Sequence, residues 1–143
     1  MRIKDVISAK ADQAVVTIAP DATVRELVAL LAEHNVGALV VSEDGERVSG
    51  IVSERDVVRR LHTDEAVLDS AVGAIMTADV RTCAGEDALT DLMQTMTEHR
   101  VRHVPVVAAG RLTGIISIGD VVKSRIGELE FERDQLDSYV HRT

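Results

Sequence analysis

Aromatic side chains are almost absent from this chain of 143 residues, which has one Phe, one Tyr and no Trp. Apolar residues still make up 45% of the sequence, so the core must be built from Val, Ile, Leu and Ala. Proteins that bind single-stranded nucleic acids stack bases on aromatic side chains, and a formal net charge of −8 repels phosphate backbones. The composition therefore argues against a nucleic-acid partner.

Cysteine and long apolar runs are scarce as well. Cys83 is the single cysteine, so an intramolecular disulfide is excluded, and neither His62 nor His141 has a partner at a metal-ligand spacing. No apolar run approaches the length of a membrane span, and Met1 leads directly into a charged segment without a signal sequence. We expect no metal, no membrane partner and, by default, a cytoplasmic protein.

What the chain does contain is one phrase written twice, GIVSERD at 50–56 and GIISIGD at 114–120. Each copy predicts a short strand that ends on a serine and runs into a helix. Ser53 with Asp56, and Ser117 with Asp120, can form a capping box, which is the simpler interpretation of a single copy. The same side chains, with the free N–H groups of the helix start, can also cradle hydroxyls and anions. Repetition in equivalent places favours this second role.

The repeat extends through both halves of the chain. A capping box at Thr23 and Glu26 predicts a helix that ends near His34, and its counterpart ends near His99. The apolar stripe Val24, Leu27, Val28 and Leu31 recurs 65 residues later as Leu89, Leu92, Met93 and Met96. Strands are expected at 14–17, 38–41 and 103–107, turns at 43–46 and 108–110, and short lead-in helical turns at 6–8 and 75–77. Each half thus predicts strand, helix, strand, strand, helix.

Halves of about 60 residues are marginal alone, so we expect them to pack on each other as one pseudo-symmetric body. The predicted division is 1–65, 66–127 and a C-terminal amphipathic helix at 128–143. Apolar residues in and just before this helix are spaced by three or four, with Arg133 interrupting them: Ile126, Leu129, Leu136 and Val140. The helix could pack on its own protomer or a twin subunit, or bind a dedicated partner.

With these residues in hand, the chain resembles a pair of CBS domains, the regulatory module named after cystathionine β-synthase. The resemblance is carried by the two Gly-h-h-Ser-x-x-Asp phrases, the two helices that end in Glu-His, and the segment VRHVPV at 101–106. It covers Val6 to about Gly127. It implies an α/β fold whose halves meet through their sheets, two clefts that commonly bind adenine nucleotides, and a homodimer.

The residues suit such a ligand. A carboxylate can accept hydrogen bonds from both ribose hydroxyls, a role open to Asp56 and Asp120, with Ser53 and Ser117 beside them. The resemblance assigns the apolar adenine slot to Thr17, Ile18, Val36 and Ala38 in the first half, and to Thr82, Cys83, Val101 and Pro105 in the second.

The halves differ where phosphate would be bound. Arg102 and His103 precede the strand in the second half, where CBS pairs that bind AMP often carry basic residues, whereas the first half has Gly37 and Ala38. Arg55 could supply a charge to the first site. We therefore expect two unequal sites, with AMP the first candidate at Asp120, followed by ATP, ADP or NAD.

The leading hypothesis is a sensor that binds an adenine nucleotide and changes conformation for an unidentified effector protein, with no cofactor required. An enzyme is the second possibility, but we find no nucleophile–base pair, and Asp56 and Asp120 belong to separate repeats. The third is a structural adaptor with vestigial clefts that works through its C-terminal helix.

Overall fold

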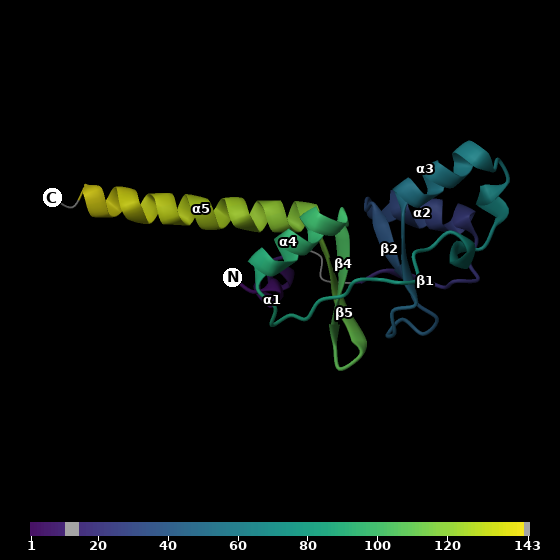
Figure 1. The fold of residues 1–143 in the computed structure, drawn as a ribbon, viewed down its shortest axis with the longest axis horizontal. Coiled ribbons are helices and arrows are strands. Elements are labelled where there is room, and N and C mark those ends of the chain that lie inside the picture. The colour runs from purple at the N-terminus through teal and green to yellow at the C-terminus, as the bar shows by residue number, and fades with distance from the viewer. Residues whose placement is uncertain (11–14, 142–143) are drawn as a thin grey trace.

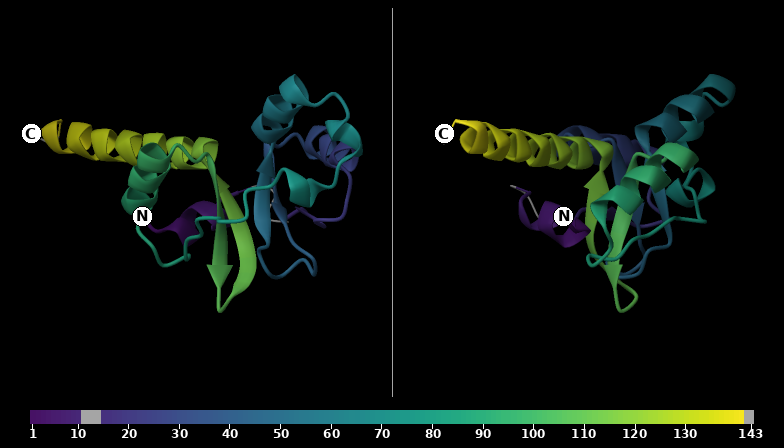
Figure 2. Two further views of the ribbon diagram at one scale, coloured as in Figure 1. Left: turned by 45° about the vertical axis from the view of Figure 1, so that its right-hand side comes forward. Right: turned by 60° about the vertical axis from the view of Figure 1, so that its left-hand side comes forward.

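The structure, a computed structural model, describes residues 1–10 and 15–141. Its elements in chain order are α1 (Ile3–Ser8), β1 (Thr17–Ile18), α2 (Val24–His34), β2 (Ala38–Val41), β3 (Gly50–Ser53), α3 (Glu54–Thr63), the 3₁₀ turns η1 (Val67–Asp69) and η2 (Val72–Ala74), α4 (Leu89–His99), β4 (His103–Ala108), β5 (Arg111–Ser117) and α5 (Ile118–Val140). Two small sheets stand side by side in the centre with helices outside them, and α5 projects away from the body (Figures 1 and 2).

The two sheets repeat one hairpin. In the first, β2 and β3 are antiparallel with Ala38 opposite Ser53, and β1 runs parallel to β2. In the second, β4 and β5 are antiparallel with His103 opposite Ser117. The expected extra strand of the second half is reduced to one bridge between Cys83 and Val106.

The first strand lies later than the predicted 14–17. It consists of Thr17 and Ile18, and the carbonyl of Ile18 accepts a hydrogen bond from the Ser42 amide at 2.9 Å. Ala14 lies outside the described residues. The strand ends just before Ala19 because Pro20 follows, and the residue before a proline is restricted by its ring.

The helices follow their capping signals. The Glu26 amide donates to Thr23 Oγ1 at 3.1 Å, which confirms the predicted box at the start of α2. The helices α2 and α4 both end at a left-handed residue without a glycine, Asn35 at φ 51° and Arg100 at φ 53°. Most of the predicted stripe is buried, but Val28 is 41% exposed and is not part of the core.

Each repeat has its own aliphatic core, but each core includes the lead-in segment of the other repeat. Ile3 and Val6 of α1 pack with the second repeat. Val72 and Ile75, which precede the second repeat, pack with the first. The predicted boundary after residue 65 therefore does not separate the two packing units. The second lead-in is also not the helical turn predicted at 75–77, since η2 ends at Ala74.

The glycine that opens each repeated phrase lies under the lead-in segment that crosses it. A Cβ added at Gly50 would lie 2.7 Å from Met76 Sδ and 2.8 Å from the Thr77 carbonyl oxygen. At Gly114 the nearest atoms belong to Ile7, at 3.4 Å. Because glycine has no side chain, the lead-in segment can cross close to the strand, and this approach is closer at Gly50 than at Gly114.

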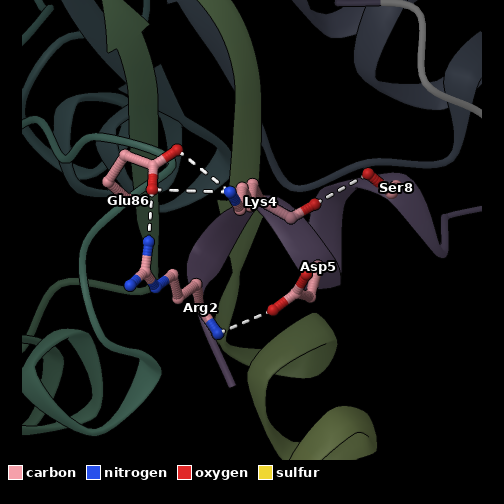
Figure 3. A network of polar contacts seen from close by, with 5 residues as sticks. All are labelled: Arg2, Lys4, Asp5, Ser8 and Glu86. Carbon is pink, nitrogen blue, oxygen red and sulfur yellow. Dashed lines mark hydrogen bonds and ion pairs between the residues drawn. The ribbon is translucent and has the colours of Figure 1, made fainter.

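Polar contacts fasten α1 to the second repeat (Figure 3). Arg2 and Lys4 both bind the Glu86 carboxylate, with Lys4 Nζ at 3.1 Å from Oε1. These two cations lower the pKa of Glu86, Lys4 contributing most. The backbone adds to the attachment, since the Ile3 amide donates to the Asp87 carbonyl at 3.0 Å. The N-terminal helix is thus part of the second repeat in space.

The two repeats meet through their sheets, which confirms the α/β architecture expected from the resemblance. Alternation along β2 turns Ala38 and Val40 away from the core that holds Leu39 and Val41. Both are nevertheless buried, at 4% and 0% exposure, and Pro105 of β4 is fully buried as well. These side chains fill the space between the sheets.

The predicted helix after Ser117 and the predicted C-terminal helix at 128–143 are one continuous helix. The helix α5 runs without a break from Ile118 to Val140, so the predicted boundary after Gly127 falls inside it. Its first turns are held by the second repeat, where Val121 is 2% exposed. Beyond residue 128 every described side chain of the helix is exposed, so this part makes little contact with its own protomer. Among the described residues, no helix has the length and apolarity needed to cross a membrane.

Candidate ligand-binding clefts

Both repeated phrases form the predicted capping box. The Ser53 amide donates to Asp56 Oδ2 at 2.8 Å, and the Asp56 amide donates back to Ser53 Oγ at 3.3 Å. In the second repeat the Ser117 amide donates to Asp120 Oδ2 at 2.9 Å, and the Asp120 amide donates to Ser117 Oγ at 3.1 Å. Each capping contact of the carboxylate uses Oδ2. Within the described residues Oδ1 accepts no hydrogen bond in either repeat, so capping and ligand binding are compatible.

Asp120 has an additional partner that reasoning from the sequence did not identify. Lys10, which follows α1, places Nζ 3.0 Å from Asp120 Oδ2 and donates to the Ile115 carbonyl at 3.1 Å. Burial works to raise the pKa of Asp120, but the hydrogen bonds from Ser117 and the Lys10 ammonium outweigh it, and the pKa is lowered. Asp120 is therefore held as a carboxylate. An ammonium has three N–H donors, and the described residues use two of those of Lys10, so a third can serve a ligand.

The pair borders a cavity of about 620 Å³ between α1 and α5. Such a volume is typical of small-molecule sites, which span roughly 300–1,000 Å³. Its lining combines polar and apolar residues: Lys10, Asp120, Lys123, Ser124 and Glu128, with Met1, Val6, Ala9, Gly127 and Phe131. The cleft therefore offers both charged and apolar groups to a ligand.

The matching end of the first repeat lacks this chemistry. Aligning the lead-in segments VISAK (6–10) and IMTAD (75–79) puts Asp79 in the place of Lys10, so an acid replaces the base. Asp79 is exposed, and Asp56 binds Ser53 Oγ at 3.1 Å instead of an ammonium. A nearby cavity of about 380 Å³ is lined by Val36, Glu54 and Val58 among others, but not by Asp56.

The two basic residues expected to bind phosphate, Arg102 and His103, lie in different environments. His103 is partly buried at the interface between the repeats, with its Cε1 3.5 Å from where a Gly37 side chain would begin. Burial lowers the pKa of His103, although Asp120 and Glu54 oppose the shift, so the ring is neutral at pH 7. Arg102 is exposed and lines a separate groove with Ile118 and Val122.

Of the residues assigned to the adenine slots, Ala38 lies opposite Ser53, at the serine–aspartate end of the first repeat. Ile18 is buried in the first core, and Thr17 lies level with Val40, two residues beyond the Ala38–Ser53 pair. Cys83 belongs to the second core, where burial raises its pKa to about 12. With Thr82 it borders a different cavity, of about 290 Å³, near α4.

Four further residues of the predicted sites complete the description. Arg55 is exposed on α3 and makes no hydrogen bond or ion pair within the described residues. Val36 is 42% exposed, whereas its counterpart Val101 is half-buried against the second core. Pro105 lies between the sheets, and its carbonyl accepts a hydrogen bond from the Cys83 amide at 3.0 Å. Their ligand roles stay predictions.

The fold and its two serine–aspartate ends define a tandem, pseudo-symmetric α/β repeat protein. The CBS domain family model matches residues 3–63 and 72–127, and the chain belongs to this family. The mitochondrial CBS domain-containing protein CBSX3 of Arabidopsis thaliana is 36% identical over 146 residues, which cover 96% of this chain and 71% of the relative.

Solved structures agree with this assignment. The CBS-domain containing protein ATU1752 from Agrobacterium tumefaciens is 43% identical, with a TM-score of 0.82 over 87% of this chain and 99% of that chain. The CBS domain pair of protein MJ0100, solved with 5′-methylthioadenosine and S-adenosyl-L-methionine, has a TM-score of 0.77 over 90% of this chain and 98% of that one. At 22% identity this second likeness shows the fold alone.

Proposed function

We propose that the chain is a regulatory module that binds an adenosine-containing ligand in the cleft beside Asp120 and transmits its occupancy to another protein. The observation that carries the proposal is the cavity of about 620 Å³ bordered by the paired Asp120 and Lys10. This is a binding function, in which no covalent bond is made or broken. The expected setting is the cytoplasm, and no cofactor is required.

The chemistry of the cleft favours a nucleotide with at least one phosphate. Oδ1 of Asp120 can accept from a ribose hydroxyl, and the remaining donor of Lys10 can bind a phosphate oxygen. Ala9 and Phe131 offer apolar surface for the base. AMP satisfies all three features with the smallest ligand, and ADP, ATP and NAD are the next candidates.

The complex of MJ0100 supports adenosine as the shared part of the ligand, because both compounds bound there contain it. S-adenosyl-L-methionine differs from AMP in carrying a sulfonium cation. The Lys10 ammonium disfavours a second positive charge nearby, so we expect this chain to prefer the phosphate-bearing compounds.

Lys10 also connects the cleft to other parts of the second repeat, so a ligand bound there could affect them. It connects the segment after α1 to β5 through Ile115 and to the start of α5 through Asp120. A ligand that draws Lys10 toward a phosphate changes how the lead-in segment sits on the second repeat. To act as a signal, the ligand must bind one of the two arrangements more tightly than the other.

Thermal unfolding with AMP, ADP, ATP, NAD and S-adenosylmethionine tests the proposal. A ligand at about one hundred times its Kd stabilises a protein by roughly 2.7 kcal/mol, which gives a clear shift of Tm. We expect AMP to raise the Tm of the parent and not that of Asp120→Ala, while Asp56→Ala retains the shift. If none of the five compounds shifts nucleotide-free protein, the regulatory proposal fails and the adaptor hypothesis replaces it.

A further inference from the structure

The ligand cleft extends along α5 past the point where this helix leaves the body of the protein. Its α5 wall runs from Asp120 to Phe131, roughly 16 Å along the helix axis. We define the arm as residues 129–140 of α5, whose side chains are all exposed. The arm projects away from the body in all three views of the fold (Figures 1 and 2). Phe131 therefore belongs both to the cleft and to the arm.

The protomer anchors α5 only up to the beginning of the arm. Val121 is buried in the second core. Glu128 is half-buried, and its Oε1 lies 3.6 Å from Arg125 Nη1, so this ion pair spans Gly127. Phe131 follows about one turn later and is 65% exposed. A ligand that covers its ring would add a tertiary contact to the arm.

The sequence of the arm, LEFERDQLDSYV, predicts a weak helix. It carries four acidic residues and one basic residue, and Glu130 and Asp134 repel each other at a spacing of four. Its last turn has no basic residue to offset the negative end of the helix dipole. Gly127, just before the arm, is a poor helix former. An exposed helical segment of about a dozen residues is marginal in water, so the arm depends on added contacts for stable helical structure.

A nucleotide in the cleft can supply such a contact. Side chains of a helix lean toward its N-terminus, which brings the ring of Phe131 toward Asp120. Flat aromatic groups stack on one another, so the adenine base can lie on Phe131 while the ribose binds Asp120. The ligand then ties the arm to the part of α5 that the protomer anchors.

We infer that occupancy of the cleft controls the helical order of the arm. Without ligand, α5 frays beyond Gly127, and a nucleotide stacked on Phe131 keeps it helical to its end. This inference rests on the proposed nucleotide site and adds how its occupancy changes a surface outside the cleft. The acidic arm is then the part of the module that differs between the two states.

Hydrogen–deuterium exchange of the full chain, with and without saturating AMP, tests the inference at two places, 117–122 beside the cleft and 129–140 in the arm. In the parent we expect AMP to slow exchange at both, in the arm by on the order of tenfold. Phe131→Ala, saturated with AMP, should keep the protection at 117–122 and lose that of the arm. The matched control Tyr139→Ala removes the other exposed ring of the arm, which is not among the described residues lining the cleft, and should keep both.

Gly127→Ala strengthens the junction between the anchored part of α5 and the arm. An added Cβ would meet no described side chain or neighbouring segment within 4 Å. We expect slower exchange of the arm without AMP and a smaller change when AMP is added. The Kd for AMP should fall by up to about fivefold, because less ordering accompanies binding.

The two places separate failure of the inference from failure of the proposed function. Protection at 117–122 without protection of the arm overturns the inference and leaves the nucleotide site intact. Protection at neither place means that AMP does not bind, and both then fall. An arm that exchanges as slowly as the core without AMP, or that is equally protected in Phe131→Ala, also overturns the inference.

Discussion

The two serine–aspartate ends share a backbone and differ in charge. Both Ser53–Asp56 and Ser117–Asp120 close a capping box at a helix start, with nearly the same distances. Among the residues that the structure describes, only the second end receives an ammonium, from Lys10, where the first repeat has Asp79. The comparison shows that the repeated phrase determines the local turn, whereas the crossing lead-in segment determines its electrostatics. The phrase alone therefore does not identify a binding site.

The largest expected effect concerns the glycines beneath the lead-in segments. Gly50→Ala places a Cβ 2.7 Å from Met76 Sδ and 2.8 Å from a backbone oxygen, whereas at Gly114 the closest contact is 3.4 Å, to a side chain. We expect Gly50→Ala to lower the free energy of unfolding by about 1–3 kcal/mol, and Gly114→Ala by clearly less. Urea unfolding of both variants measures the difference. Equal losses would show that the two crossings are equally tight.

Removal of the ammonium should have a smaller effect. Lys10→Met keeps the length of the side chain but leaves Asp120 without its ion pair, whose side chains are 27% and 23% exposed. We expect the free energy of unfolding at pH 7 to fall by about 1 kcal/mol, because the pair is only partly shielded from water. Asp79→Asn, at the matching position of the first repeat, is the control and should change it little. Chemical unfolding at low and high salt checks both variants. If Lys10→Met leaves the free energy of unfolding unchanged, the ion pair has no stabilising role.

The smallest effect is a dependence on pH that only the second repeat should show. Burial lowers the pKa of His103. The carboxylates of Asp120 and Glu54 oppose this shift, whereas the positive charges of Lys10 and Arg102 add to it. The imidazole of His103 therefore binds a proton more readily in the unfolded chain than in the folded one. Stability should therefore fall as pH drops through the ordinary histidine range, with a slope of at most about 1.4 kcal/mol per pH unit.

Substitution of His103 isolates this slope. The first repeat has Ala38 at the matching position, so it has no histidine there that could contribute to the slope. His103→Gln should flatten the unfolding free energy between about pH 7 and pH 5, above the range in which Asp120 titrates. Urea midpoints measured across that interval provide the test. A slope that persists in the variant would assign the titration to other groups.

Much of this fold could be predicted because its signals are local. The Ser-x-x-Asp phrases and the Thr23–Glu26 box fix three helix starts through contacts spanning three residues, and the repeat offset supplies the order of the elements. The start of α5 at the second phrase was predicted, but its continuation was not, because the acidic composition changes near residue 128 although the helix continues through Gly127. Hydrophobic pattern shows that a segment is buried, not what it is buried against.

The candidate cleft could be predicted only in part for the same reason. Asp120 was identified from its own phrase, but Lys10 lies 110 residues earlier and reaches it through a lead-in segment that packs on the other repeat. A comparison of Lys10 with Asp79 was the signal available in the sequence. Ile18 and Cys83 were placed in the sites by resemblance; their side chains are buried in the two cores, and their ligand roles stay predictions.

Isothermal titration calorimetry of AMP into nucleotide-free parent, Asp56→Asn and Asp120→Asn measures most directly whether the two ends are unequal. Each substitution keeps the size of the side chain and removes its charge. The account predicts one site per chain in the parent and in Asp56→Asn, and no measurable binding to Asp120→Asn. Two equal sites in the parent, or binding that is lost in Asp56→Asn and kept in Asp120→Asn, would contradict it.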